Sequence, residues 1–466
     1  MDAPRRRILE VLGTAGIAAL AGCNSTENDG TPVESSPTGT LTEREGDGDP
    51  QTTATPAPKQ PSVPTEQAVT ISPDDGASKD LFGKVAVLAG DGSTAAIAAP
   101  NDGGRNDGNR GSVYVFARSG GSWSRQTKLT ASDGDKNDFF GQAVSMSNSG
   151  STVVVGAPGD DVQGTRQRGS AYVFRRSGGS WSQDGHLVGE GIEGNGYPEL
   201  GKSVAVSADG DTVLAGVPGD YDPNGSYAGS TCVFARSSGS WSQQAKLAAG
   251  DGNEEDFFGR SVAMANDSST VAVGAPDEED PNGSESGAVY VFVRSGGGWS
   301  QTAKLTAGDG DERDFLGRSV SISGDGSTVI AGADRDEDPA GDASGSAYVF
   351  GRSGGSWTQQ VKLAADDGDA SDRFGTAVSI SETGSTVVVG ADRDDSTGKN
   401  AGSAYAFARS DGSWSQQAKL VASEGNKDAE MGASVSVSAD GTMALVGAPW
   451  ELEPNGYGGG SAYIFE

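Results

Sequence analysis

The sequence is poor in the residues that carry much of enzyme chemistry. It has one histidine, His186, and two cysteines among 466 residues. His186 aligns with lysines of neighbouring repeats on a predicted outer strand, where neither a Ser-His-Asp triad nor a histidine-ligated zinc site can be assembled. Cys232 is left without a partner once Cys23 is assigned to an export signal, so no internal disulfide is expected. We therefore expect no enzymatic activity.

Basic residues are also scarce. The chain has 34 lysines and arginines against 65 aspartates and glutamates, a net charge of −31. This balance argues against nucleic acid and against anionic lipid surfaces as partners. The acids are spread evenly along the chain, which is typical of a protein adapted to molar salt. Long apolar runs are missing as well, because the stretch from Val11 to Leu20 is too short for a comfortable membrane span.

What the sequence does contain is a long repeat, seen most clearly between Asp314 and Leu363. Each copy has four runs of four to eight residues, rich in Val, Ile, Ser, Thr and aromatics and bounded by Gly, Asp and Ser, which predicts four strands. Such a four-stranded unit predicts a blade of a β-propeller. One glycine of the unit recurs seven times, 57 to 60 residues apart, at Gly83, Gly141, Gly201, Gly259, Gly317, Gly375 and Gly432.

The two ends of the repeat region predict a closed ring. The seventh copy stops at Phe465-Glu466, after its third strand. Residues 67–71 precede the first copy and are in register with the fourth strand at 301–305. We expect this N-terminal segment to complete the last blade, which leaves no open edge between blades. The predicted fold is all-β, a seven-bladed propeller of four-stranded antiparallel blades over residues 66–466.

Two short motifs of the unit resemble FG-GAP repeats. Phe-Gly opens the first strand, as at Phe82-Gly83 and Phe140-Gly141, and Gly-Ala-Pro closes the second, as at Gly156 to Pro158 and Gly274 to Pro276. FG-GAP repeats build the seven-bladed propeller of integrin α subunits and of many microbial surface proteins. The resemblance implies a binding or adhesion module. It does not extend to the family's D-x-D-x-D-G calcium loop, because this chain has tight turns such as 323–326 there.

Residues 1–23 resemble an export signal rather than a folded segment. Arg5-Arg6 fits the twin-arginine (Tat) signature, and residues 20–23 resemble a lipobox in which Cys23 becomes the lipidated mature terminus. Residues 24–65 are rich in Thr, Pro, Ser, Gly and acids, which predicts a disordered stalk of about 35–40 Å. We expect a monomer on the outer face of the membrane, held only by its lipid, in a halophilic archaeon.

Loops between blades contain a candidate metal site. Four of them carry oxygen-bearing side chains at positions i, i+2 and i+5 around a glycine, a spacing that suits calcium. The alternative is an Asp-Gly turn with solvated acids of a salt-adapted surface. The candidate residues are Asp133, Asp135 and Asp138; Asp251, Asn253 and Asp256; Asp309, Asp311 and Asp314; and Asp367, Asp369 and Asp372.

Three further sets of residues complete the predictions. Loop aromatics are candidate contacts for a glycan or a surface protein, with the alternative for Trp450 that it folds back onto its own blade: Trp450, Tyr457, Tyr221 and Tyr227. Fourth-strand lysines are expected to act as charges that keep an exposed sheet edge from associating: Lys128, Lys246, Lys304, Lys362 and Lys419. Repeated tryptophans are expected to pack the outer strand: Trp123, Trp181, Trp241, Trp299, Trp357 and Trp414.

The function predicted from these features is binding or adhesion through the face that carries the long acidic loops. Two alternatives remain open: a carbohydrate-active enzyme, either hydrolase or lyase, and an envelope scaffold without a discrete ligand. An enzyme would be expected to depart strongly from the repeat in one blade. Blades three and seven come closest to such a departure.

Overall fold

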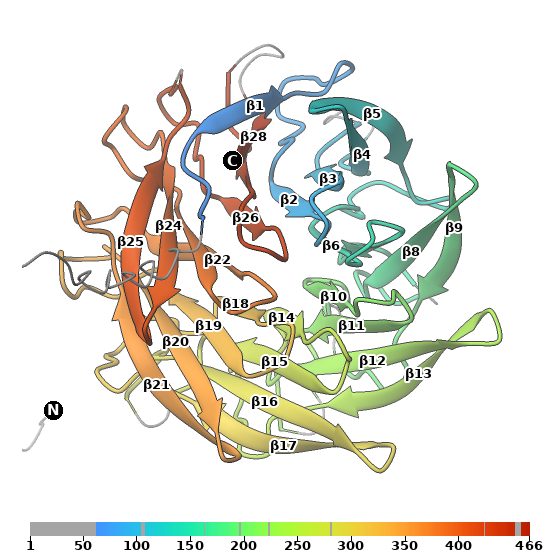
Figure 1. Ribbon diagram of the computed structural model, residues 1–466. Coiled ribbons are helices and arrows are strands. Elements are labelled where there is room, and N and C mark those ends of the chain that lie inside the picture. The colour runs from blue at the N-terminus through green and yellow to red at the C-terminus, as the bar shows by residue number, and fades with distance from the viewer. Residues whose placement is uncertain are drawn as a thin grey trace, which may run out of the picture. The chain divides into compact units, whose positions relative to one another are not determined.

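The computed structural model describes residues 62–103, 108–162, 164–194, 197–221, 224–279, 282–423, 425–452 and 458–466. These residues form seven four-stranded antiparallel sheets, set around a central axis as the blades of a ring (Figure 1). The predicted all-β propeller is confirmed. In this part of the chain no helix is long and apolar enough to cross a membrane. The export signal with Arg5, Arg6 and Cys23, and nearly all of the predicted stalk, lie outside the described residues.

The strands follow one another in the same order in every blade. Blades one to three consist of β2 (Val85–Leu88), β3 (Thr94–Ala99), β4 (Ser112–Ser119), β5 (Ser122–Leu129); β6 (Ala143–Met146), β7 (Thr152–Ala157), β8 (Ser170–Ser177), β9 (Ser180–Leu187); and β10 (Val204–Val206), β11 (Thr212–Val217), β12 (Ser230–Ser237), β13 (Ser240–Leu247). Blades four and five consist of β14 (Ser261–Met264), β15 (Thr270–Ala275), β16 (Ala288–Ser295), β17 (Gly298–Leu305); and β18 (Ser319–Ile322), β19 (Thr328–Ala333), β20 (Ser346–Ser353), β21 (Ser356–Leu363). Blades six and seven consist of β22 (Phe374–Ile380), β23 (Thr386–Ala391), β24 (Ser403–Ser410), β25 (Ser413–Leu420); and β26 (Ser434–Val437), β27 (Ala444–Ala448), β28 (Ser461–Phe465), β1 (Gln67–Ile71).

The first strand of each blade lines a central channel of about 330 Å³. Serines on these short strands join one blade to the next. Ser321 accepts a hydrogen bond from the backbone N–H of Ile380 at 3.2 Å, and Ser379 accepts one from Val437 at 3.1 Å. Ser436 does the same with Leu88 at 3.0 Å, which spans the junction of blades seven and one. These bonds satisfy backbone groups that a narrow inner strand leaves unpaired.

The two glycine motifs meet at the junctions between blades. Gly317 has a φ of +91°, and a Cβ on Gly274 of the preceding blade would lie 2.0 Å from the Gly317 carbonyl oxygen. Neither position can carry a side chain, which explains why Phe-Gly and Gly-Ala recur together. The same contact is made by five further pairs: Gly156 and Gly201, Gly216 and Gly259, Gly332 and Gly375, Gly390 and Gly432, and Gly447 and Gly83.

The hydrophobic core lies between blades rather than within one. Each buried cluster combines residues of two adjacent sheets; Val289 and Val291 of blade four, for example, join Tyr348 and Phe350 of blade five. All six repeated tryptophans are partly buried against these clusters. Their predicted packing role is confirmed. Because each cluster is shared by two sheets, every blade depends on its neighbours for part of its hydrophobic core.

Strand β1 closes the ring as predicted. It pairs antiparallel with β28, with Thr70 opposite Tyr463 and Ile71 opposite Ala462 (Figure 1). Backbone hydrogen bonds between Glu66 and Glu466, at 3.0 and 3.2 Å, extend the pairing beyond the strand. The first and last parts of the repeat region therefore form one blade, and Ile71 is buried in the cluster shared by blades seven and one.

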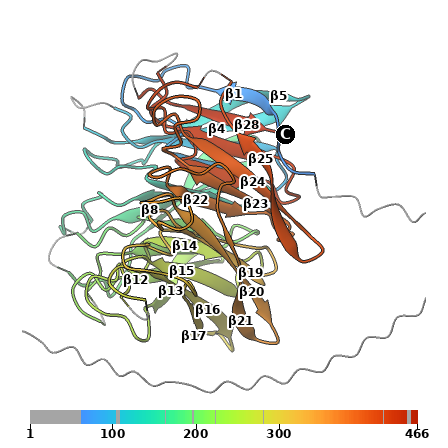
Figure 2. The ribbon, with the colours of Figure 1, turned by 90° about the vertical axis from the view of Figure 1, so that its left-hand side faces the viewer.

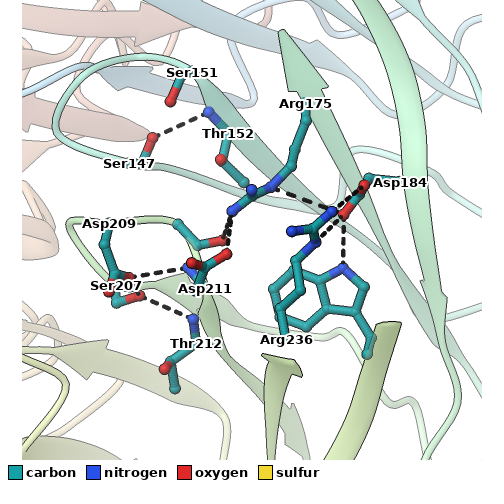
Figure 3. A network of polar contacts seen from close by, with 12 residues as sticks. Ser147, Ser151, Thr152, Arg175, Asp184, Ser207, Asp209, Asp211, Thr212 and Arg236 are labelled. Carbon is teal, nitrogen blue, oxygen red and sulfur yellow. Dashed lines mark hydrogen bonds and ion pairs between the residues drawn. The ribbon is translucent and has the colours of Figure 1, made fainter. Parts of the chain in front are cut away.

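Blades two and three are linked by a polar network at their hairpin ends (Figure 3). Arg236 donates to both oxygens of Asp184, at 2.9 and 3.1 Å, and Trp241 Nε1 donates to the same carboxylate at 3.0 Å. Arg175 reaches across to the Gly210 carbonyl oxygen at 2.7 Å. Burial opposes ionisation of Asp184, but the hydrogen bonds from Arg236 and Trp241 hold its pKa below the ordinary value. This carboxylate therefore remains charged and fixes the junction near neutral pH.

Candidate binding site on the long-loop face

The two faces of the ring differ in the length of their connections. One face carries the loops that join the second strand to the third in each blade, together with the loops between blades; we call it the long-loop face. The opposite face carries two-residue hairpins and tight turns, and we call it the short-turn face. Seen from the side, the long connections gather on one side of the ring and the hairpins β20–β21 and β24–β25 extend toward the other (Figure 2).

The last residue of each candidate calcium triplet is buried and serves the loop itself. Asp314 is 2% exposed, and its Oδ2 accepts a hydrogen bond from the Asp311 backbone N–H at 2.8 Å. An aspartate that accepts from the backbone three residues earlier holds a turn closed. The equivalent bonds are made by Asp138 with Asp135, by Asp256 with Asn253 and by Asp372 with Asp369.

The first residue of each triplet points elsewhere, toward the outer strand of the blade that follows. Asp309 pairs with Lys362 at 3.1 Å and Asp251 pairs with Lys304 at 3.0 Å. Asp367 pairs with Lys419 in the same way, at 2.7 Å. The prediction that the fourth-strand lysines are free edge charges is therefore wrong, because their side chains are only 16–27% exposed and are held in ion pairs.

Each lysine also meets an acidic residue that follows the second strand of its own blade and that sequence reasoning missed; these carboxylates are 0–18% exposed. Glu278 is fully buried; Lys304 approaches its Oε1 at 3.1 Å, and the Tyr290 hydroxyl donates to its Oε2 at 2.7 Å. A signal was present in the sequence, because the third residue after every second strand is acidic. These residues are Asp102, Asp160, Asp220, Glu278, Asp336, Asp394 and Glu451. Their role is to anchor the long loops to the outer strands.

The three members of a candidate calcium set are thus not brought together. In blade five, Asp309 binds Lys362 while Asp314 caps its own turn. Within the described residues there is no group of three or more His, Cys, Asp or Glu side chains that could hold a metal ion. The carboxylate spacing that suits calcium in the sequence is used here for ion pairing and for turn formation.

Blades two and three vary the same network. His186 replaces the lysine of blade two, lies 3.3 Å from Asp160 and 3.4 Å from Asp133, and stacks on Tyr172 with ring centroids 4.4 Å apart. In blade three Cys232 replaces the tyrosine; it is a buried free thiol whose pKa burial raises to about 12. His186 and Cys232 thus occupy the lysine and tyrosine positions that, in other blades, contact the acidic residue after the second strand.

The buried turn aspartates predict an unusual pH dependence of stability. Burial, and then the nearby Asp336 and Glu337, raise the pKa of Asp314 to about 7, so the folded protein binds this proton more readily than the unfolded chain. The destabilisation from an ionised Asp314 is therefore full above pH 7 and disappears as the pH falls. We expect Asp314→Asn to raise stability at pH 8 by at least about 1 kcal/mol, with a smaller gain at pH 5.5. Urea unfolding at both pH values checks this, with Asp366→Asn, an exposed aspartate of the next loop between blades, as control. Equal gains at both pH values would contradict it.

The candidate ligand contacts fall into two separate places. Tyr221 and Tyr227 of blade three lie edge to face with centroids 5.1 Å apart, and Tyr227 continues to Phe257 at 5.7 Å. Trp450 belongs to blade seven, where its ring lies so close to Gly458 that a Cβ there would be 3.0 Å from Cε3. Tyr457 lies outside the described residues. The structure therefore joins the two tyrosines in one aromatic track, away from Trp450.

The aromatic track leads to a cavity between blades four and five, of about 230 Å³. Its walls come from the loops that open β14 and β18 and from the end of β15. The lining residues are Phe257, Arg260, Pro276, Asp277, Phe315, Arg318 and Arg335. We call this the arginine cavity. It concentrates guanidinium groups and phenyl rings on a face that is otherwise rich in acids.

Sequence reasoning missed the arginine cavity. The sequence does contain a sign of this cavity in the residue that follows the repeated glycine of each first strand. This residue is basic in four blades: Lys84, Lys202, Arg260 and Arg318. Phe257 and Phe315 precede that glycine by two residues and have φ angles of +53° and +58°. A bulky residue seldom adopts this left-handed conformation, so the ring positions are not visible in a strand pattern.

A closed ring of seven four-stranded antiparallel blades, with long loops on one face, defines the protein as a seven-bladed β-propeller. The model of the FG-GAP repeat matches residues 65–116, 123–174, 241–292, 299–350, 357–407 and 414–465, which is more than half of the chain. The chain belongs to the FG-GAP repeat family. The matches leave out the repeat around Gly201, which the structure shows as blade three. No curated protein matches the chain.

Proposed function

We propose that this protein is a cell-surface binding or adhesion module that recognises a glycan or a surface protein with its long-loop face. The observation that carries the proposal is the continuous set of partly buried aromatic and basic side chains over blades three to five. Tyr221, Tyr227 and Phe257 form its aromatic part, and Arg260 and Arg318 its basic part. Aromatic and arginine side chains contribute most of the binding energy in recognition surfaces.

The place of the protein in the cell is part of the same proposal. Arg5, Arg6 and Cys23 support export and lipid anchoring to the outer face of the membrane, and the acidic composition supports a halophilic source. The propeller would then present one face to its partners at the end of a polar stalk, as a monomer.

We place the protein with binding modules rather than with enzymes. The support is the repetition itself, because each long-loop anchor uses the same carboxylate, tyrosine and lysine positions from blade to blade. His186 occupies one of these anchoring positions, between Asp133 and Asp160. The carboxylates that the sequence suggests as calcium ligands thus form ion pairs and hydrogen bonds that stabilise the loops.

A binding array tests the proposal. The full chain is applied at molar potassium chloride to arrays of glycans and of surface proteins, beside the variant Tyr221→Ser/Tyr227→Asn. We expect reproducible binding of the unchanged protein to a defined subset of ligands and a loss of about tenfold or more in the variant, since two aromatic contacts are removed. Asparagine is chosen for position 227 because the φ there is +56°.

The matched control lies on the short-turn face. Ser356→Glu adds a charge to an exposed hairpin there and is expected to leave binding unchanged. The proposal is contradicted if the array shows no reproducible ligand. It is also contradicted if Ser356→Glu weakens binding as much as the double tyrosine variant does.

A further inference from the structure

The arginine cavity has an excess of positive charge in a chain of net charge −31. Three guanidinium groups line it, against a single lining carboxylate, Asp277. Two further carboxylates lie near the lining: Asp334, 3.8 Å from Arg318, and Glu285, which raises the pKa of Asp277. Arg335 lies over the Phe315 ring, 5.0 Å from its centroid. An anion entering the cavity would therefore meet unbalanced positive charge rather than the acidic field typical of this surface.

Arg260 is the residue that most needs a partner. It is partly buried, and among the described residues its guanidinium makes no hydrogen bond and no ion pair. Burial, and then the neighbouring Arg318, lower its pKa. A guanidinium has five N–H donors, and the nitrogens of Arg260 are not among the buried side-chain atoms without a partner, so they are accessible to a ligand from solvent. A ligand with a carboxylate can accept two of these donors in parallel.

The carboxylate that lines the cavity interacts with Arg260, Arg318 and Arg335 at a distance, but these interactions are outweighed by burial and by Glu285. Burial, and then Glu285, raise the pKa of Asp277 to about 6. A carboxylate held in a close ion pair with arginine would show the opposite shift. Asp277 and Arg260 thus share the cavity without forming an ion pair within 4 Å.

An equivalent cavity between blades two and three shows which part of this arrangement is special. It has a volume of about 190 Å³ and a corresponding phenyl wall, Phe139. Gln142 stands where Arg260 does, and Lys202 stands in the position of Arg318. Lys202 is paired with Glu199 at 3.1 Å. The cavity is therefore a product of the repeat, whereas the three arginines that line it belong to blades four and five.

We propose that the arginine cavity binds a uronic-acid residue of an acidic glycan, which deepens the proposed function and rests on it. The carboxylate pairs with Arg260, and the sugar ring lies against Phe257, Phe315 and Pro276. A cavity of about 230 Å³ is smaller than pockets that enclose a whole ligand, typically about 300–1,000 Å³, so it takes one residue of a longer chain. Tyr227, 5.7 Å from Phe257, continues the apolar surface for the next sugar.

Titration calorimetry on the full chain tests the proposal with three probes: tetragalacturonate, the neutral maltotetraose and the peptide tetraglutamate. We expect tetragalacturonate to bind and the other two not to bind. Arg260→Gln should weaken tetragalacturonate by about tenfold or more, because it removes the charge-assisted contact with the ligand carboxylate. Arg335→Gln should weaken it by about threefold or more, because it removes positive charge from the lining. Lys202→Gln, in the equivalent cavity of blades two and three, should leave the affinity unchanged. Arg335 is exposed, so its variant remains informative even if Arg260→Gln destabilises the ring.

The outcomes separate this inference from the proposed function. Equal weakening by Lys202→Gln, or tetraglutamate binding that matches tetragalacturonate, overturns the acidic-glycan site. Absence of tetragalacturonate binding also overturns it, while array binding that depends on Tyr221 and Tyr227 would leave the proposed function standing. If the array too shows no ligand, both fail.

Discussion

Deletion of residues 66–71 is expected to destabilise the whole protein, with the unfolding temperature lowered by at least about 5 °C or the chain assembling through exchanged strands. These residues form β1, which pairs with β28 and completes blade seven. Without β1, the backbone groups of β28 are unpaired on one side and the cluster around Leu445 and Ile464 loses Ile71. Burial of one such side chain contributes about 1.5–3 kcal/mol, before the lost hydrogen bonds are counted.

Calorimetry and size-exclusion chromatography measure both consequences of this deletion. Removal of residues 40–45, within the segment predicted to be disordered, is the length-matched control and should change neither the unfolding temperature nor the elution volume. A normal melting curve and a monomeric profile after deletion of residues 66–71 would contradict closure by the N-terminal strand.

Lys304→Met is expected to cost about 3 kcal/mol, because it leaves Glu278 buried without its cation. Lys304 Nζ lies 3.1 Å from Glu278 and 3.0 Å from Asp251, and the Glu278 side chain is fully buried. Burial opposes the charge on Lys304, but hydrogen bonds to these two carboxylates outweigh it and hold its pKa above the ordinary value. The free energy of unfolding, measured with urea at pH 7, gives the loss.

Two further variants show whether the loss comes from the buried pair. Lys427 forms a long, solvent-exposed ion pair: its side chain is 66% exposed and lies 3.7 Å from Asp428. Lys427→Met should therefore cost no more than about 1 kcal/mol. Adding Glu278→Gln to Lys304→Met removes the unpaired charge and should restore part of the stability. If Lys304→Met is as harmless as Lys427→Met, the long loops are not anchored in this way.

The fold could be predicted from the sequence because its determinants are local and repeated. Gly317 and its counterparts mark each first strand, the four apolar runs follow in order, and the structure shows why the glycines cannot vary. Closure of the ring could be predicted from the two ends of the repeat region. The last repeat lacks a fourth strand, and residues 67–71, before the first repeat, are in register with one. Repetition makes each of these signals visible seven times over.

The site could not be predicted in the same way, because it depends on side chains that meet only in three dimensions. The spacing of Asp309, Asp311 and Asp314 suited calcium, but the partner of Asp309 is Lys362, 53 residues further on, and the structure separates the carboxylates. The fourth-strand lysines were misread for the same reason. A sequence pattern shows which charges recur, not which of them face one another.

The arginine cavity illustrates the opposite case, in which function is expected where the repeat is broken. Gln142, Thr376 and Ala433 occupy the position of Arg260 in three other blades, and two more blades have lysine there, so arginine at this position is specific to blades four and five. Only the ring geometry shows that Arg260, Arg318 and Arg335 line one cavity. Departures from a repeat that converge in space are stronger indications of a site than departures scattered along the chain.

Hydrogen–deuterium exchange of the full chain, with and without a ligand identified on the array, tests the central claim most directly. If the long-loop face of blades three to five is the binding surface, the ligand should slow exchange in residues 224–229, 255–260, 315–318 and 334–336. Exchange in the short-turn hairpins, such as residues 353–356 and 410–413, should remain unchanged. Protection confined to those hairpins, or spread evenly over all seven blades, would contradict the account.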